Sequence, residues 1–147
     1  NDTLLSQSED LKKFTTKDFK IVSKKKPTKS QLKDLIFEFN VCRYVKSNAI
    51  VYAKNKKTIG IGAGQMSRVY SARIAAIKAK DEKLAITGAV MASDAFFPFP
   101  DCVEIAYNEG IKTVIQPGGS IKDKLSIEYC DKNEMKMVFT GIRHFKH

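Results

Sequence analysis

Five polar or charged side chains lie in four segments that follow predicted strands or helices. The side chains are Asn48, Arg68, Asp94, Asp101 and Ser120, and the segments are 46–48, 62–68, 94–101 and 116–120. An amide both donates and accepts hydrogen bonds, and a guanidinium matches carboxylates and phosphates with its planar fork. Open α/β sheets bind their ligands at the carboxyl ends of the strands. If three of these segments lie along one edge of the sheet, they form one pocket.

The stretch from Met91 to Asp101 is the most unusual of these segments. An apolar run that ends at Ala92 leads into a Ser-Asp pair, and Phe and Pro occupy residues 96–100. Proline ends a strand and restricts the residue before it, so a stiff aromatic loop is expected here. Two interpretations stay open: the loop borders a ligand site, or it only covers the core with buried Phe side chains.

The segment before Arg68 is rich in glycine. Gly60, Gly62 and Gly64 alternate, and glycine in a strand marks close approach of another backbone or a ligand. Ser67 is expected to cap a helix, and glycine before a capped helix start is an anion-binding geometry. The segment matches neither the P-loop pattern nor GxGxxG. Arg68 lies in the first turn, where cations are disfavoured, which indicates a role beyond the helix itself.

Composition limits the remaining possibilities. The 147 residues predict one domain, and the net charge of +10 favours an anionic partner such as a phosphate ligand or a nucleic acid. Solvated surfaces explain the two lysine runs equally well, because aromatic residues do not alternate with them. The three Cys form no CxxC, which is typical of buried thiols in a reducing compartment. No apolar run approaches the roughly 18 residues of a membrane span.

The periodicity predicts an α/β fold with a mixed, largely parallel sheet flanked by helices. We expect strands at 19–22, 49–53, 58–62, 84–92, 113–116 and 136–140, and helices at 28–45, 67–80, 100–109 and 122–133. Thr28 and Gln31 are expected to form a capping box. The polar residues 1–24 are interpreted as a connector from a preceding part, and 25–147 as one subdomain. The chain begins without Met, which indicates a fragment.

Five segments resemble the AICAR transformylase/IMP cyclohydrolase family. They are 46–50 (KSNAI), 60–69 (GIGAGQMSRV), 92–99 (ASDAFFPF), 115–121 (IQPGGSI) and 139–147 (FTGIRHFKH). The matches are long and in the right order, and the resemblance runs from about Lys25 to His147. It implies a cytidine-deaminase-like subdomain, the C-terminal part of the AICAR transformylase domain.

The resemblance implies transfer of a formyl group from 10-formyltetrahydrofolate to the 5-amino group of AICAR in purine (IMP) biosynthesis. Whole members of the family also close the ring to give IMP. The family's catalytic Lys-His pair belongs to the preceding half, and Lys146-His147 does not match its context. We therefore expect this chain to supply binding and orientation, with no catalytic residue of its own and little activity alone.

The same resemblance assigns individual residues. It implies AICAR contacts from Asn48, Arg68, Phe96 and Arg143. It implies folate contacts from Val69, Asp101, Ser120 and Ile121. It also implies a monovalent cation such as potassium near Ser47 and Asp94, held partly through backbone carbonyls, although Val45 and His144 differ from the family pattern there. A cytoplasmic homodimer without a nucleic-acid or membrane partner is also implied.

Three other classes of protein would require different residues or a different binding behaviour. A basic nucleotide- or nucleic-acid-binding module without catalysis would bind with a steep salt dependence and would be indifferent to folate. A zinc deaminase needs a cluster of His and Cys with a Glu, but the only His are His144 and His147. A purely structural domain would not need this set of residues in loops: Asn48, Arg68, Asp101 and Arg143.

Overall fold

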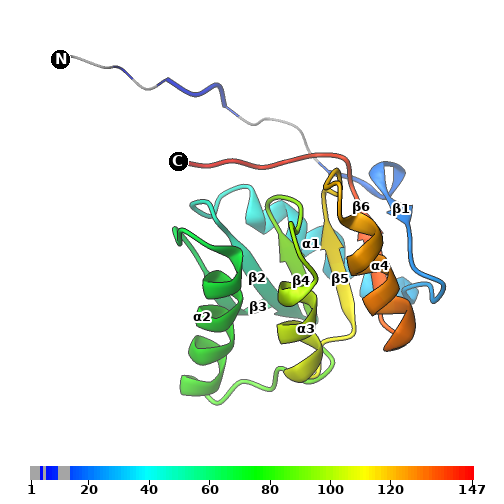
Figure 1. Cartoon of the computed structure of the whole chain (residues 1–147). Coiled ribbons are helices and arrows are strands. Elements are labelled where there is room, and N and C mark those ends of the chain that lie inside the picture. The colour runs from blue at the N-terminus through cyan, green and yellow to red at the C-terminus, as the bar shows by residue number, and fades with distance from the viewer. Residues whose placement is uncertain (1–3, 5, 10–13) are drawn as a thin grey trace.

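A six-stranded sheet forms the centre of the molecule (Figure 1). The computed structural model describes residues 4, 6–9 and 14–147. The strand order is β1-β6-β5-β4-β2-β3. The strands are β1 (Lys20–Ile21), β2 (Ile50–Lys54), β3 (Lys57–Gly62), β4 (Val90–Ser93), β5 (Thr113–Gln116) and β6 (Lys136–Phe139). The helices are η1 (Thr16–Asp18, a 3-10 helix), α1 (Lys29–Cys42), α2 (Arg68–Asp81), α3 (Asp101–Asn108) and α4 (Asp123–Lys132).

The expected mixed sheet is confirmed. Strands β4, β5 and β6 pair in parallel, whereas β2 is antiparallel to both β3 and β4, and β1 is antiparallel to β6. Strands β3 to β6 therefore all run in one direction. The β2–β3 hairpin turns at Asn55 and Lys56, which both have positive φ. The Asp34 carboxylate of α1 accepts both of their backbone N–H groups, at 3.1 and 2.9 Å.

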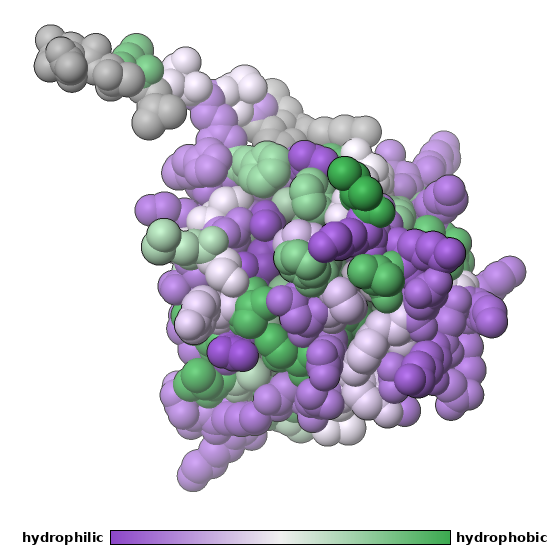
Figure 2. Space-filling view, viewed as in Figure 1, coloured by the Kyte–Doolittle hydropathy of each residue, from purple (hydrophilic) through white to green (hydrophobic). Residues whose placement is uncertain are grey.

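Helices cover both faces of the sheet. On one face, α2, α3 and α4 pack on alternate strand residues such as Tyr52, Met91 and Met137. On the other face, α1 packs through Leu35 and Phe39 on the intervening strand residues, which point to the opposite side of the sheet. The face formed by α2, α3 and α4 is mostly hydrophilic outside, with hydrophobic residues showing between the hydrophilic ones (Figure 2). Successive residues of a strand are buried on opposite faces of the sheet. This explains the clear strand pattern of the sequence.

The alternating glycines of β3 allow α2 to lie directly on the sheet. A Cβ at Gly60 would come within 2.1 Å of the Ala75 carbonyl oxygen, and one at Gly62 within 1.8 Å of the Ser71 carbonyl oxygen. The close approach expected from the sequence is thus made by the helix backbone. It also sets the position of the first turn of α2, which carries Arg68.

Part of the segment interpreted as a connector belongs to the folded core. Phe14 is buried and packs on the rings of Phe19 and Phe39, at centroid distances of 4.9 and 4.7 Å. Strand β1 adds an edge to the sheet beside β6. Within the described residues, no helix has the length and apolar character needed to cross a membrane.

Some element boundaries differ from those expected. The strand predicted from residue 84 begins only at Val90, because the chain turns at 87–88, where Gly88 has a φ of +80°. Helix α1 ends at Cys42, three residues earlier than expected. Its capping box between Thr28 and Gln31 is confirmed. Helix α4 begins at Asp123, so the last predicted helix starts one residue later than expected.

Glu38 of α1 is fully buried between the helix and the sheet. Burial raises the pKa of its carboxyl well above the ordinary value. The backbone N–H of Ala92 lowers the pKa, but by a smaller amount. A buried carboxyl without a cationic partner favours the neutral form. The folded chain therefore holds a proton at Glu38 that the unfolded chain releases at lower pH.

Replacing Glu38 should change how stability depends on pH. Between the ordinary pKa and the raised one, the folded state binds more protons than the unfolded state, so stability falls as pH rises. This group contributes a slope of up to about 1.4 kcal/mol per pH unit. We expect Glu38→Gln to remove that contribution in urea unfolding between pH 5 and 8. The exposed control Glu82→Gln should keep the wild-type slope, and equal slopes for all three proteins would contradict the prediction.

Candidate functional site

The four segments singled out in the sequence meet at the carboxyl ends of β4, β5 and β6. Gly64 N–H donates to the Lys46 carbonyl at 2.8 Å, which joins the first two segments. Phe97 N–H donates to Gln116 Oε1 at 3.1 Å, which joins the last two. The C-terminal tail, residues 140–147, crosses over this edge from β6 toward β2 (Figure 1). Its Lys146 carbonyl accepts the N–H of Ser47 at 2.8 Å.

Asp94, directly after β4, is the buried charge at the centre of this edge. Its carboxylate accepts a hydrogen bond from Ser47 Oγ and pairs with Arg68 Nη2 at 3.2 Å. The Asp94 side chain is 0% exposed and that of Arg68 is 16% exposed, so water screens the pair weakly. The pairing explains why a cation occupies the first turn of α2, against the helix dipole.

Asn48 lies beside this pair and borders an open pocket of about 310 Å³. Its side-chain amide donates to the Gln65 carbonyl at 2.8 Å, and its own carbonyl accepts from Ser71 Oγ at 2.7 Å. Phe145 and His147 of the tail line the same pocket. Asn48 is therefore held in place by α2 and the preceding loop, at the wall of a cavity.

Phe96 and Arg143 form a second part of the site. The Arg143 guanidinium carbon lies 4.6 Å from the centroid of the Phe96 ring, a cation–π distance. A Cβ at Gly119 would lie 3.5 Å from Arg143 Nη2, so the glycine loop after β5 borders the same guanidinium. The N–H of His144 donates to the Asp94 carbonyl at 2.9 Å, which connects this pair to the buried carboxylate.

The four residues assigned to folate lie at the starts of α2 and α3 and in the loop before α4, and no hydrogen bond joins them. Asp101 begins α3, and its Oδ1 accepts the N–H of Cys102 at 3.0 Å. Ser120 Oγ accepts the N–H of Lys122 at 3.1 Å. Ile121 is fully exposed, whereas Val69 packs against the core.

The three cysteines are buried thiols, on α1, α3 and α4. Burial raises the pKa of Cys42 well above its ordinary value. Burial, and then the Asp101 charge, raise the pKa of Cys102 to about 12, while the Arg68 charge acts in the other direction. Because the thiolate is the reactive form, none of them is suited to be a nucleophile. In the part of the chain that the structure describes, no three His, Cys, Asp or Glu are grouped to hold a metal.

The structure also brings residues into the site that the sequence did not single out. Gln65 bonds Asn48, and Gln116 bonds the aromatic loop. Lys122 Nζ lies 4.0 Å from the centroid of Phe99, a second cation on this loop. The sequence placed Gln116 at a strand end before a Pro-Gly-Gly turn, within a segment that resembles the family, but neither signal shows where its amide points.

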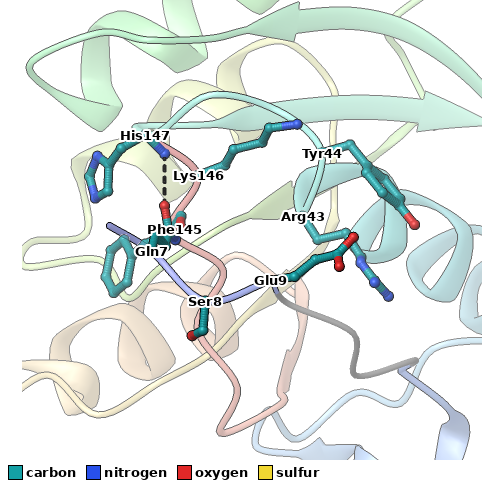
Figure 3. A pocket seen from close by; sticks show the side chains of 8 residues that line it. All are labelled: Gln7, Ser8, Glu9, Arg43, Tyr44, Phe145, Lys146 and His147. Carbon is teal, nitrogen blue, oxygen red and sulfur yellow. Dashed lines mark hydrogen bonds between the residues drawn. The ribbon is translucent and has the colours of Figure 1, made fainter. Parts of the chain in front are cut away.

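Two further pockets border other parts of the chain, and one of them shares the tail residues Phe145 and His147 with the Asn48 pocket. One, of about 440 Å³, is bordered by Arg43 and Tyr44, by the tail and by residues 7–9 (Figure 3). There the N–H of His147 donates to Gln7 Oε1 at 3.4 Å. The other, of about 350 Å³, lies at the opposite end of the parallel strands and contains the ion pair of Lys25 and Glu134 at 2.8 Å. Neither contains a residue that the sequence assigned to AICAR or folate.

Comparison with solved structures defines the class of fold. The chain is similar to the dCMP deaminase of cyanophage S-TIM5, with a TM-score of 0.50, 15% sequence identity, and coverage of 67% of this chain and 88% of that one. The protein thus has a deaminase-like α/β fold, and the likeness concerns the fold alone.

Sequence comparison then shows the family. The model of the AICARFT/IMPCHase bienzyme family matches residues 1–78. The chain is 60% identical over 144 residues to the bifunctional purine biosynthesis protein PurH of Xylella fastidiosa (strain 9a5c), covering 98% of this chain and 27% of that protein. The chain belongs to the AICARFT/IMPCHase bienzyme family, as the sequence motifs predicted, and spans about a quarter of that relative's length.

Removing the Asp94 charge should cost substantial stability. In Asp94→Asn, the largely buried Arg68 loses its carboxylate, and breaking a buried pair on one side costs about 3 kcal/mol or more. We expect the free energy of unfolding in urea to fall by about 3 kcal/mol. The control Asp101→Asn removes a half-buried carboxylate at a helix start and should cost at most about 1 kcal/mol. Equal losses in the two variants would contradict a central role for the pair.

Proposed function

We propose that the chain is the C-terminal part of an AICAR transformylase domain and contributes substrate binding to formyl transfer. The whole enzyme would move a formyl group from 10-formyltetrahydrofolate to AICAR and would also cyclise the product to IMP. The observation that carries the proposal is the guanidinium of Arg143, stacked on Phe96 at 4.6 Å beside the buried Arg68–Asp94 pair. That arrangement offers a cation and an aromatic wall to a phosphorylated ligand.

Each AICAR residue would have a distinct task. Arg143 presents an exposed planar fork that suits a phosphate. Asn48, at the wall of the 310 Å³ pocket, suits the carboxamide edge of the ligand. Arg68 is already paired, so it would act with its remaining donors: its Nε is buried and makes no hydrogen bond in the described structure. Phe96 would supply the wall on which Arg143 is held.

The folate would lie on the side of Asp101 and the 118–121 loop. Asp101 could accept hydrogen bonds from the amino-pyrimidine edge of the pterin, and Ser120 could donate one. Ile121, which is fully exposed, offers apolar surface, while Val69 would act from beneath through packing. The carboxylates of the folate tail and the phosphate of AICAR both agree with a net charge of +10.

The proton transfers would be carried out by residues outside this chain. The AICAR amine attacks the formyl carbon, the new C–N bond forms, and the bond from the formyl carbon to N10 of the folate breaks. The amine loses a proton, and N10 gains one. The family's Lys-His pair is the expected source of the base and the oxyanion donor. Residues 25–147 would then orient the two ligands. Orientation by itself can supply a large part of the rate acceleration of a reaction between two bound molecules.

A monovalent cation near Ser47 and Asp94 finds little support in the geometry. Both Asp94 oxygens already have partners, one of which is the guanidinium of Arg68. A potassium ion there would be repelled by that charge unless the pair separated. The family also leads us to propose a cytoplasmic homodimer, with residues 1–24 entering from the preceding part of the enzyme.

Titration calorimetry with AICAR tests the proposed binding. We expect saturable binding that Arg143→Ala weakens about tenfold to a hundredfold, because a charged hydrogen bond contributes about 1.5–3 kcal/mol. Asn48→Ala should also weaken it, and a folate analogue should bind separately and depend on Asp101. Arg73→Ala is the matched control, since it removes one exposed cation from α2, away from the site.

The same titrations separate this function from a general basic module. A nucleic-acid-binding surface would lose affinity equally in Arg143→Ala and Arg73→Ala and would release its ligand steeply with salt. Equal effects of the two arginines, or no saturable AICAR binding, would contradict the proposal.

A further inference from the structure

Gln116 is a fully buried amide at the end of β5, behind the aromatic loop. Its Oε1 accepts the N–H of Phe97 at 3.1 Å, and its Nε2 donates to Met137 Sδ at 3.6 Å. A buried amide is costly unless its polar atoms are bonded, so these contacts fix the direction of the side chain. The Gln116 side chain therefore fixes the aromatic loop through its hydrogen bond with the N–H of Phe97.

The backbone of the same residue holds the C-terminal tail. The Gln116 carbonyl accepts the N–H of Thr140 at 3.0 Å, and the next carbonyl, of Pro117, accepts the N–H of Gly141 at 2.8 Å. Parallel pairing of β5 with β6 thus continues past the strand ends into the tail. One residue bonds the aromatic loop with its side chain and the tail with its main chain.

These two segments carry the Phe96–Arg143 pair. Phe96 directly precedes the N–H held by Gln116, and Arg143 follows the anchored Thr140 by three residues. Arg143 is exposed, and a cation–π contact at an exposed site is too weak to fix two loops by itself. The 4.6 Å stacking distance therefore depends on how the two segments are anchored.

We propose that Gln116 is a positioning residue of the Phe96–Arg143 pair: its side-chain bond to Phe97 and its main-chain bond to Thr140 set the distance between ring and guanidinium, together with the bond from the His144 N–H to the Asp94 carbonyl. Gln116 does not contact a ligand in this account. Its effect on ligand affinity rests on the proposed AICAR function, but its effect on the pair does not.

Three variants separate positioning from stability. Gln116→Met keeps the length of the side chain but removes the acceptor for Phe97. Gln116→Glu keeps an acceptor oxygen at the same reach and is the rescue variant. Ile115→Val opens a small cavity on the neighbouring buried position of β5 without touching either loop, so it reports on stability alone.

The ring-current shift of the Arg143 side-chain protons in NMR spectra is the main measurement, with Phe96→Leu as the reference for a missing ring. We expect Gln116→Met to lose at least half of that shift and to weaken AICAR binding about tenfold. Gln116→Glu and Ile115→Val should retain most of the shift. In the wild-type chain, the Phe97 and Thr140 amides should exchange with solvent at similarly slow rates.

Three results would overturn the proposal. One is a wild-type ring-current shift in Gln116→Met, another is an equal loss in Ile115→Val, and the third is fast exchange of the Phe97 amide in the wild-type chain. Fast exchange of the Phe97 amide is measured without any variant, so it would overturn the proposal even if Gln116→Met does not fold. If the shifts behave as expected while the wild-type chain binds no AICAR, positioning by Gln116 stands and the proposed function fails.

Discussion

The buried carboxylate of Asp94 is the constraint on which the rest of the site depends. A charge that is fully removed from water must be paired, or its burial costs several kcal/mol. Ser47 and Arg68 satisfy it from two different segments, and its own carbonyl accepts the N–H of His144 from a third. One residue at the end of β4 thus holds the 46–48 segment, the start of α2 and the C-terminal tail together.

The sheet makes this arrangement possible through its glycines. Because Gly60 and Gly62 have no side chain, the backbone of α2 can lie directly on β3, which brings the first turn of the helix to the edge where β4 ends. Arg68 can then reach Asp94 across 26 positions of sequence. The parallel order of β4, β5 and β6 places the aromatic loop, the glycine turn and the tail side by side.

Local signals in the sequence predicted much of the fold. The capping box of Thr28 and Gln31 and the β2–β3 pair of strands are determined by neighbouring residues, and both appear as expected. The predicted strand from residue 84 was too long, since an apolar run does not reveal that Gly88 turns the chain. Gln116 and the crossing tail were not predicted, because long-range pairing decides their place. The AICAR and folate roles came from the family resemblance, and the structure shows only which of those residues lie together.

We propose that the site at the carboxyl ends of β4, β5 and β6 is preformed for AICAR. A crystal structure of this chain soaked with AICAR would show where the ligand lies. We expect the ligand phosphate on Arg143 and the carboxamide beside Asn48, with the Arg68–Asp94 pair intact. AICAR bound in a different pocket, or bound only after Arg68 and Asp94 have separated, would contradict it.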